Sequence, residues 1–139
     1  MIRDIVKDLE TLQMVSMKAN PNKEETKQTI IDLIDTANEH KGKCVGLSAI
    51  QIGVPLRVCV VFNGNEFIPF INPIITKSFG DKYEAEEGCM SLDGTRKVMR
   101  YDQIEVMRQT KNGFVKEKYR GYMAEILQHE IDHFNGKLI

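Results

Sequence analysis

The residues best suited to chemistry in this chain form the sequence H-E-I-D-H, which begins at His129 and ends at His133. Apolar spacing and flanking glycines predict a helix over about 122–134. In a helix of about 3.6 residues per turn, positions i and i+4 share one face, so the two imidazoles could bind one metal ion. Glu130 would flank that face, where its carboxylate could take a proton from water at the ion.

A catalytic metal site of this kind needs a third protein ligand and an open fourth position. No His, Asp or Glu follows His133, so the third ligand must come from earlier in the chain. Cys89 is the best candidate, because Gly88 beside it allows a close approach of the backbone. Two plainer interpretations stay open: the histidines could be half-buried helix residues, and Cys89 could be a small buried hydrophobe.

A third segment, C-V-G-L-S-A-I-Q-I-G, runs from Cys44 to Gly53 and is rich in small residues. Small residues suit a close approach of the backbone to a ligand or to a helix. Gln51 is the one amide in this apolar run, and a buried amide needs hydrogen-bond partners. A substrate carbonyl oxygen is one possible partner, and a purely structural role for Gln51 is the alternative.

Hydrophobic periodicity predicts the elements that would position these groups. The spacing indicates a short helix or a surface loop over 2–15. It also predicts a helix over about 23–40, with Asn22 and Glu25 forming a capping box. Strand patterns follow at 58–62, 66–71, 74–77, 83–87, 98–101, 104–108 and 114–119.

Turn and breaker residues complete this pattern. Pro69 and Pro73 are expected at strand edges or breaks, and K-N-G at 111–113 predicts a hairpin turn. The order of one helix, many strands and a last helix predicts an α+β fold, with curved, mostly antiparallel β-sheets packed around the C-terminal metal-binding helix. A length of 139 residues predicts a single domain over 1–139.

The composition argues against several classes of function. Nineteen basic residues face twenty acidic ones, and the net charge of -1 gives no strong field for nucleic acid or an anionic membrane. The first residues are charged and amphipathic, unlike a signal peptide, and no apolar run approaches the roughly 18 residues of a membrane span. Three cysteines do not suggest a disulfide framework. We therefore expect a cytoplasmic protein without direct nucleic-acid or membrane binding.

In this order, the three segments resemble the three motifs of the peptide deformylase family. G-L-S-A-I-Q at 46–51 is similar to the family's G-x-G-L-A-A-x-Q, and E-G-C-M-S at 87–91 is similar to E-G-C-L-S. Q-H-E-I-D-H at 128–133 is similar to Q-H-E-x-D-H, and Gly136 falls where the family usually has glycine. The resemblance covers about residues 28–138.

The resemblance implies a peptide deformylase-like hydrolase that removes the formyl group from the N-formylmethionine of nascent polypeptides and releases formate. It implies one divalent metal ion, expected to be Fe²⁺ in the cell, with Zn²⁺, Ni²⁺ or Co²⁺ able to take its place. Its ligands would be Cys89, His129 and His133. Metal-bound water would attack the formyl carbon with Glu130 as general base, while the amide of Gln51 and the N–H of Met90 would face the oxyanion.

The resemblance also implies a set of substrate-binding positions. Gly46 would let the substrate backbone approach as an added strand, and Arg96 would organise the site through Glu87. Val45, Tyr122, Glu125 and Ile126 match the positions that line the family's pocket for the methionine side chain. The positions in this set are Val45, Gly46, Glu87, Gly88, Arg96, Tyr122, Glu125 and Ile126. The expected partner is a formyl-Met nascent peptide, in contact with the ribosome, and the protein is expected to be a monomer.

Several residues depart from the family's pattern. Cys44 stands where glycine is usual, Ser48 where alanine is usual and Met90 where leucine is usual, and we expect little effect from these three. Asp93 replaces a common proline. Glu125 stands where the family often has arginine or an apolar residue, and a carboxylate there could change substrate preference. The first ~20 residues match the family poorly.

Two other functions remain as alternatives. One is a deformylase-like amidohydrolase with a different formyl- or acyl-amide substrate, a reading that Glu125 motivates. The other is a non-catalytic homologue that keeps the metal ion only for folding. Glu130 and Gln51 argue against the second alternative, because a structural metal site needs neither a base nor an oxyanion donor.

Overall fold

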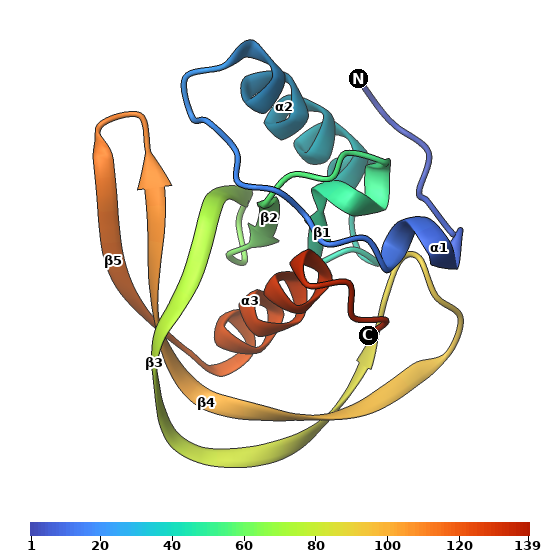
Figure 1. The fold of residues 1–139 in the computed structure, drawn as a ribbon. Helices are drawn as coiled ribbons and strands as arrows, with labels where there is room; N and C mark the ends of the chain where they lie inside the picture. Colours follow the sequence, from blue (N-terminus) through green and yellow to red (C-terminus); the bar gives the residue numbers. More distant parts are fainter.

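The sheet of this protein is an antiparallel meander in which the strands are neighbours in chain order, as the computed structural model of residues 1–139 shows (Figure 1). The strands are β1 (Gly46–Ser48), β2 (Val58–Phe62), β3 (Phe67–Gly88), β4 (Thr95–Thr110) and β5 (Gly113–Arg120). The helices are α1 (Leu9–Leu12), α2 (Glu24–Glu39) and α3 (Gly121–Phe134), with a 3-10 helix, η1 (Ala49–Ile52), after β1. The predicted α+β architecture is confirmed.

Strand β2 is buried on both faces and joins two hydrophobic clusters. Successive side chains of a strand point to opposite faces. Val58 and Val60 accordingly pack in a cluster with α2, whereas Cys59 and Val61 pack in a second cluster with α3. Full burial of such an aliphatic side chain contributes roughly 1.5–3 kcal/mol. The two helices are thus held on opposite sides of the same strand.

The long strands β3 and β4 form a curved ribbon around α3. Their pairing shifts register between Ile71 and Ile74, again before Lys77, and again between Phe79 and Lys82. Such bulges bend a strand and increase its twist. Figure 1 shows the result: the ribbon sweeps around one side of α3, and α2 lies on the other side of the molecule. The curvature brings the end of β3 back to the C-terminal helix.

The predicted strands exist, but several are parts of longer ones. The three predicted over 66–87 are one strand, β3, and the two predicted over 98–108 are both in β4. Pro69 lies where β3 pairs with β2 alone, as expected for an edge, and Pro73 lies in the first register shift, which absorbs it without ending the strand. The hairpin turn is confirmed by the pairing of Thr110 with Gly113.

The predicted capping box at the start of α2 is wrong. The residue that caps α2 is Lys23, which makes no side-chain cap, and the N–H of Asn22 bonds Asn20 Oδ1 at 3.0 Å instead. Asn20 thus closes a turn just before the helix. The first turn of the helix is stabilised by the negative charges of Glu24 and Glu25. In 2–15, only α1 is helical. No helix in the protein is long and apolar enough to cross a bilayer.

The N-terminal segment is tied to the elements that carry the site. Val6 N–H donates to Gln51 O in η1 at 2.7 Å, and Ser16 N–H donates to Phe134 O at the end of α3 at 2.8 Å. Just beyond, Gly136 has φ +77°, and a Cβ there would lie 2.3 Å from Gln13 O. Both its conformation and its contact with the backbone require glycine.

We predict that Gly136→Ala lowers the free energy of unfolding by about 3 kcal/mol, which corresponds to a fall in Tm of roughly 10 °C. The left-handed conformation costs an L-residue about 1–2 kcal/mol, and the backbone contact adds to it. Gly64→Ala is the matched control, since φ is +99° there but nothing lies within 4 Å. Thermal unfolding of both variants is the measurement, and equal shifts would contradict the role given to the contact with Gln13.

Candidate active site

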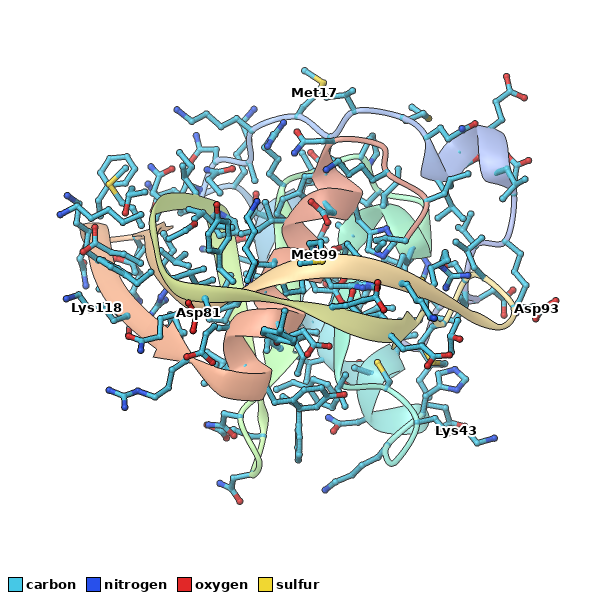
Figure 2. The ribbon with its side chains drawn as sticks, turned by 90° about the horizontal axis from the view of Figure 1, so that it is seen from below. Met17, Lys43, Asp81, Asp93, Met99 and Lys118 are labelled. Carbon is cyan, nitrogen blue, oxygen red and sulfur yellow. The ribbon has the colours of Figure 1, made fainter.

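A cavity of about 480 Å³ opens between α3, the end of β3 and the loop that leads into β1. In Figure 2, Lys43 and Asp93 mark two loops close to this cavity, on the same side of the molecule. All but two of the predicted site residues line it. They are Val45, Gly46, Gln51, Glu87, Gly88, Cys89, Met90, Tyr122, Glu125, Ile126, His129 and Glu130. Of the other two, His133 lies more deeply, only 1% exposed.

Three donor atoms of these residues are spaced as a metal ion requires. Nε2 of His129 and Nε2 of His133 are 3.2 Å apart, and Cys89 Sγ is 3.6 Å from His133 Nε2. All three atoms lie within 4.8 Å of one another. A tetrahedral ion with typical bond lengths would hold two nitrogens about 3.3 Å apart and a nitrogen and a sulfur about 3.6 Å apart. The residues present therefore fit a single ion of this kind.

A buried ion-pair network orients the first histidine. His129 Nδ1 lies 2.8 Å from Glu87 Oε1, so its N–H donates to the carboxylate and its Nε2 is free for a metal. Arg100 donates to both oxygens of Glu87, at 2.9 and 2.7 Å, and to Asp132 at 2.6 Å. Burial alone would raise the pKa of Glu87, but Arg100 and His129 outweigh it and lower the pKa to about 2. Glu87 is thus a fixed anion.

The two imidazoles lie in different electrostatic surroundings, which shift their pKa values in opposite directions. Burial lowers the pKa of His129, but the neighbouring Cys89 and Glu87 outweigh this effect and raise it to about 10. Burial, followed by the charge of His129, lowers the pKa of His133 to about 3. His133 is therefore the neutral imidazole of the pair, and its Nε2 faces Cys89 Sγ and His129 Nε2.

The amide of Gln51 is oriented by a partner at each of its ends. Its Oε1 accepts from the backbone N–H of Ser48 at 2.9 Å, so its Nε2 faces Cys89 Sγ at 3.3 Å and Ser91 Oγ at 3.2 Å. Between these two, Met90 lines the cavity, and its backbone N–H donates to no acceptor within the protein. The Met90 N–H is therefore available to an oxygen atom of a ligand, and beside it the two hydrogens of Gln51 Nε2 are directed to Cys89 and Ser91.

Glu130 is 3% exposed and lies against β1. Ser48 Oγ donates to Glu130 Oε1 at 2.9 Å, and it also lies 3.0 Å from the backbone oxygen of Glu130. A Cβ on Gly46 would be 2.6 Å from Glu130 Oε2 and 2.7 Å from Ile126 Cγ2, so glycine is needed here for the carboxylate to fit. Burial raises the pKa of Glu130, partly offset by His129 and Ser48.

The predicted role of Arg96 is wrong. Arg96 pairs with Glu87 across the sheet, but its side chain makes no hydrogen bond to the Glu87 carboxylate; its Nη1 donates to Asp93 O at 3.2 Å, and it lies outside the cavity. Arg100 makes that contact, because it is buried beneath α3 between two carboxylates, whereas Arg96 sits at the start of β4 beside its own turn. The arginine that contacts the Glu87 carboxylate is therefore Arg100, four residues after the position that the motif spacing indicated.

Glu125 lies in the cavity wall and has a fixed partner. Tyr83 O–H, on β3, donates to Glu125 Oε1 at 2.8 Å. Burial raises the pKa of Glu125, opposed by Tyr83 and reinforced by Glu87. Tyr122 is 62% exposed at the rim of the cavity, and Ile126 is buried beside it. Val45, Tyr122 and Ile126 therefore form an apolar part of the cavity wall, and Glu125 places a carboxyl group beside it.

Sequence reasoning missed four residues that support the site: Ser48 as a partner of Glu130, Ser91, Tyr83 and Arg100. The alternation of β4 offered a signal for Arg100, which shares the face of Ile104 and Val106, where an arginine needs partners. The contacts of Ser48, Ser91 and Tyr83 bridge distant segments, so no local pattern indicates them.

The chain is similar over nearly its whole length to one family of known proteins. The family model described as polypeptide deformylase matches residues 2–139. A peptide deformylase of Clostridium beijerinckii is 45% identical over 141 residues, which span the whole of both chains. The chain belongs to the polypeptide deformylase family. The match begins at residue 2, so it extends beyond the range of about 28–138 over which the motifs resemble the family.

Solved structures of this hydrolase family share the fold. A peptide deformylase from Legionella pneumophila has a TM-score of 0.88 at 37% identity, covering 99% of this chain and 83% of that one. One from Thermotoga maritima has a TM-score of 0.88 at 34% identity, covering 99% and 94%. The N-terminal segment and the long β3–β4 ribbon thus both lie within the region shared with the family.

We predict that Arg100→Met destabilises the protein by about 3–5 kcal/mol, because it leaves the carboxylates of Glu87 and Asp132 without their buried partner. Metal affinity should fall with it, since Glu87 no longer fixes His129. Arg96→Met removes the same charge from a side chain that makes no hydrogen bond to the Glu87 carboxylate, and we expect it to cost less than about 1 kcal/mol. Urea unfolding and metal titration of the two variants provide the test, and a reversed order would contradict the network.

Proposed function

We propose that this chain is an active peptide deformylase that hydrolyses the formyl amide of N-formylmethionine at the start of nascent polypeptides. The observation that carries the proposal is the meeting, in one cavity, of three metal-donor atoms at tetrahedral spacing with a buried carboxylate and an oriented amide. Membership in the family supports the same reaction. A structural metal site would need neither Glu130 nor Gln51.

Cys89, His129 and His133 would hold the metal ion. A divalent ion at these donors would lower the pKa of water to about 7 and polarise the formyl oxygen. A thiolate with two imidazoles suits borderline ions, so ferrous iron, zinc, nickel and cobalt all fit the donor set, with ferrous iron as our choice for the ion in the cell. The donors leave the cavity side open for the substrate.

Glu130 would carry the proton. Its raised pKa places it closer to neutrality than an exposed glutamate, which suits a group that first accepts a proton and then gives it up. In the proposed reaction it takes a proton from the attacking water and delivers it to the nitrogen of the departing amine. The bond between the formyl carbon and this nitrogen breaks, and formate leaves.

Gln51 Nε2 and the backbone N–H of Met90 would stabilise the negative charge that develops on the formyl oxygen. Both lie at the metal ligands, and the first is fixed by Ser48. Loss of one such donor typically lowers the rate about 100- to 1000-fold. The Met90 side chain is not needed for this role, so its difference from leucine is harmless.

The substrate would bind along the edge of the sheet. β1 is an edge strand, and Val45 and Gly46 line the cavity, so an extended peptide could add to that edge through main-chain hydrogen bonds. The methionine side chain would enter the pocket formed by Val45, Tyr122 and Ile126. A nascent chain leaving the ribosome in the cytoplasm is the proposed partner, and the protein would act as a monomer.

A second candidate is a related amidohydrolase with a preference for another formyl or acyl amide. The contact between Tyr83 and Glu125 favours it, because it fixes a carboxyl group in the wall that receives the side chain. A carboxyl group there offers a hydrogen-bond partner that a thioether uses poorly.

We predict that protein loaded with ferrous iron without oxygen hydrolyses formyl-Met-Ala peptides faster than free formyl-amino acids and faster than acetyl peptides. Removal of the metal by a chelator should abolish turnover and lower Tm, and metal addition should restore both. Formate release and thermal unfolding are the measurements. A preference for another amide would favour the second candidate, and turnover that survives metal removal would contradict the metal mechanism.

Glu130→Gln should lower kcat by about 100- to 10,000-fold while the bound metal stays, because the amide cannot accept the proton. Glu84→Gln is the matched control: Glu84 is exposed on β3, outside the cavity, and its loss should leave kcat unchanged. Steady-state kinetics and metal analysis of both variants decide the point, and unchanged turnover in Glu130→Gln would rule out this base.

A further inference from the structure

We propose that Ser48 is a positioning residue that holds both Glu130 and Gln51 in their working orientations. The proposal rests on the function proposed above. Ser48 stands where the family usually has alanine, so its hydroxyl is a feature of this chain rather than part of the general motif. It is 0% exposed, and none of its atoms reaches the cavity.

The hydroxyl of Ser48 is the only protein donor to the carboxylate of Glu130. It lies 2.9 Å from Oε1, whereas Oε2 faces Gly46. Glu130 is almost completely buried, and a hydrogen bond to a buried carboxylate is worth more than one between neutral groups. With alanine at this position, the carboxylate would lose its one fixed contact and could turn away from the metal ligands.

The same hydroxyl also reaches the main chain of residue 130. Its oxygen lies 2.9 Å from Oε1 and 3.0 Å from the backbone oxygen of Glu130. Ser48 therefore contacts both the side chain and the backbone of the residue that it positions.

The backbone of Ser48 holds the second group. Its N–H donates to Gln51 Oε1 at 2.9 Å, which directs Nε2 to the metal ligands. Ser48 itself is fixed, because it pairs with Cys59 of β2 and leads directly into η1. One residue at the junction of a strand and a helix therefore sets the distance between the base and the oxyanion donor.

The test begins with Ser48→Ala. We expect kcat to fall about tenfold on a formyl-Met peptide, with KM and metal content unchanged, and Ser48→Thr to recover most of the loss because it keeps the hydroxyl. Ser16→Ala is the matched control, since Ser16 is buried but its hydroxyl has no partner. A kcat in Ser48→Ala equal to that of the unmodified protein would overturn the proposal.

A double-mutant cycle separates positioning from general damage. Glu130→Asp shortens the base and withdraws it from Ser48, so adding Ser48→Ala to it should have little further effect. If Ser48→Ala lowers kcat by the same factor with Glu130→Asp as without it, Ser48 acts through the fold alone, and the proposal fails. A crystal structure of Ser48→Ala gives a readout without activity: a turned Glu130 side chain supports the proposal, and an unmoved one refutes it. If the unmodified protein does not hydrolyse formyl-Met peptides, the proposed function fails, while this structural readout still decides the role of Ser48.

Discussion

The carboxylate of Glu87 is the charge on which the site depends. It is buried between the guanidinium of Arg100 and the imidazole of His129, so it connects β3, β4 and α3 in one network. A buried anion is costly unless its partners are complete, and here both of its oxygens are satisfied by Arg100. The orientation of the first metal ligand follows directly, because His129 can present only Nε2 to the cavity.

The fold places this charge correctly through the curvature of two long strands. Without the register shifts in β3, the strand would run on straight and carry Glu87 and Cys89 away from α3. The clusters on the two faces of β2 then fix α2 and α3 relative to the sheet. The position of the site in this chain therefore depends on irregular positions such as Asn72, a non-glycine residue with φ 50° within the first shift.

The sequence predicted the elements and the motif residues better than the contacts between them. The H-E-I-D-H spacing placed His129 and His133 on one face because helix geometry is local. The partner of Glu87 was assigned to Arg96, since spacing after a motif does not show which inward-facing arginine lies under a helix. The capping box at Asn22 is not formed, because the N–H of Asn22 donates to Asn20 Oδ1 and not to Glu25. Ser48 looked like a neutral replacement, because its partner lies 82 residues away.

The order of the elements has a consequence for synthesis of the chain. The curved ribbon of β3 and β4 is made before α3, the helix that fills its concave side and supplies both imidazoles. During translation, the apolar face formed by residues such as Phe70, Ile104 and Val106 stays uncovered until α3 has been made. Such transiently exposed surface is prone to aggregation. The core and the metal-binding pocket should therefore close together, once α3 has followed β3 and β4 out of the ribosome.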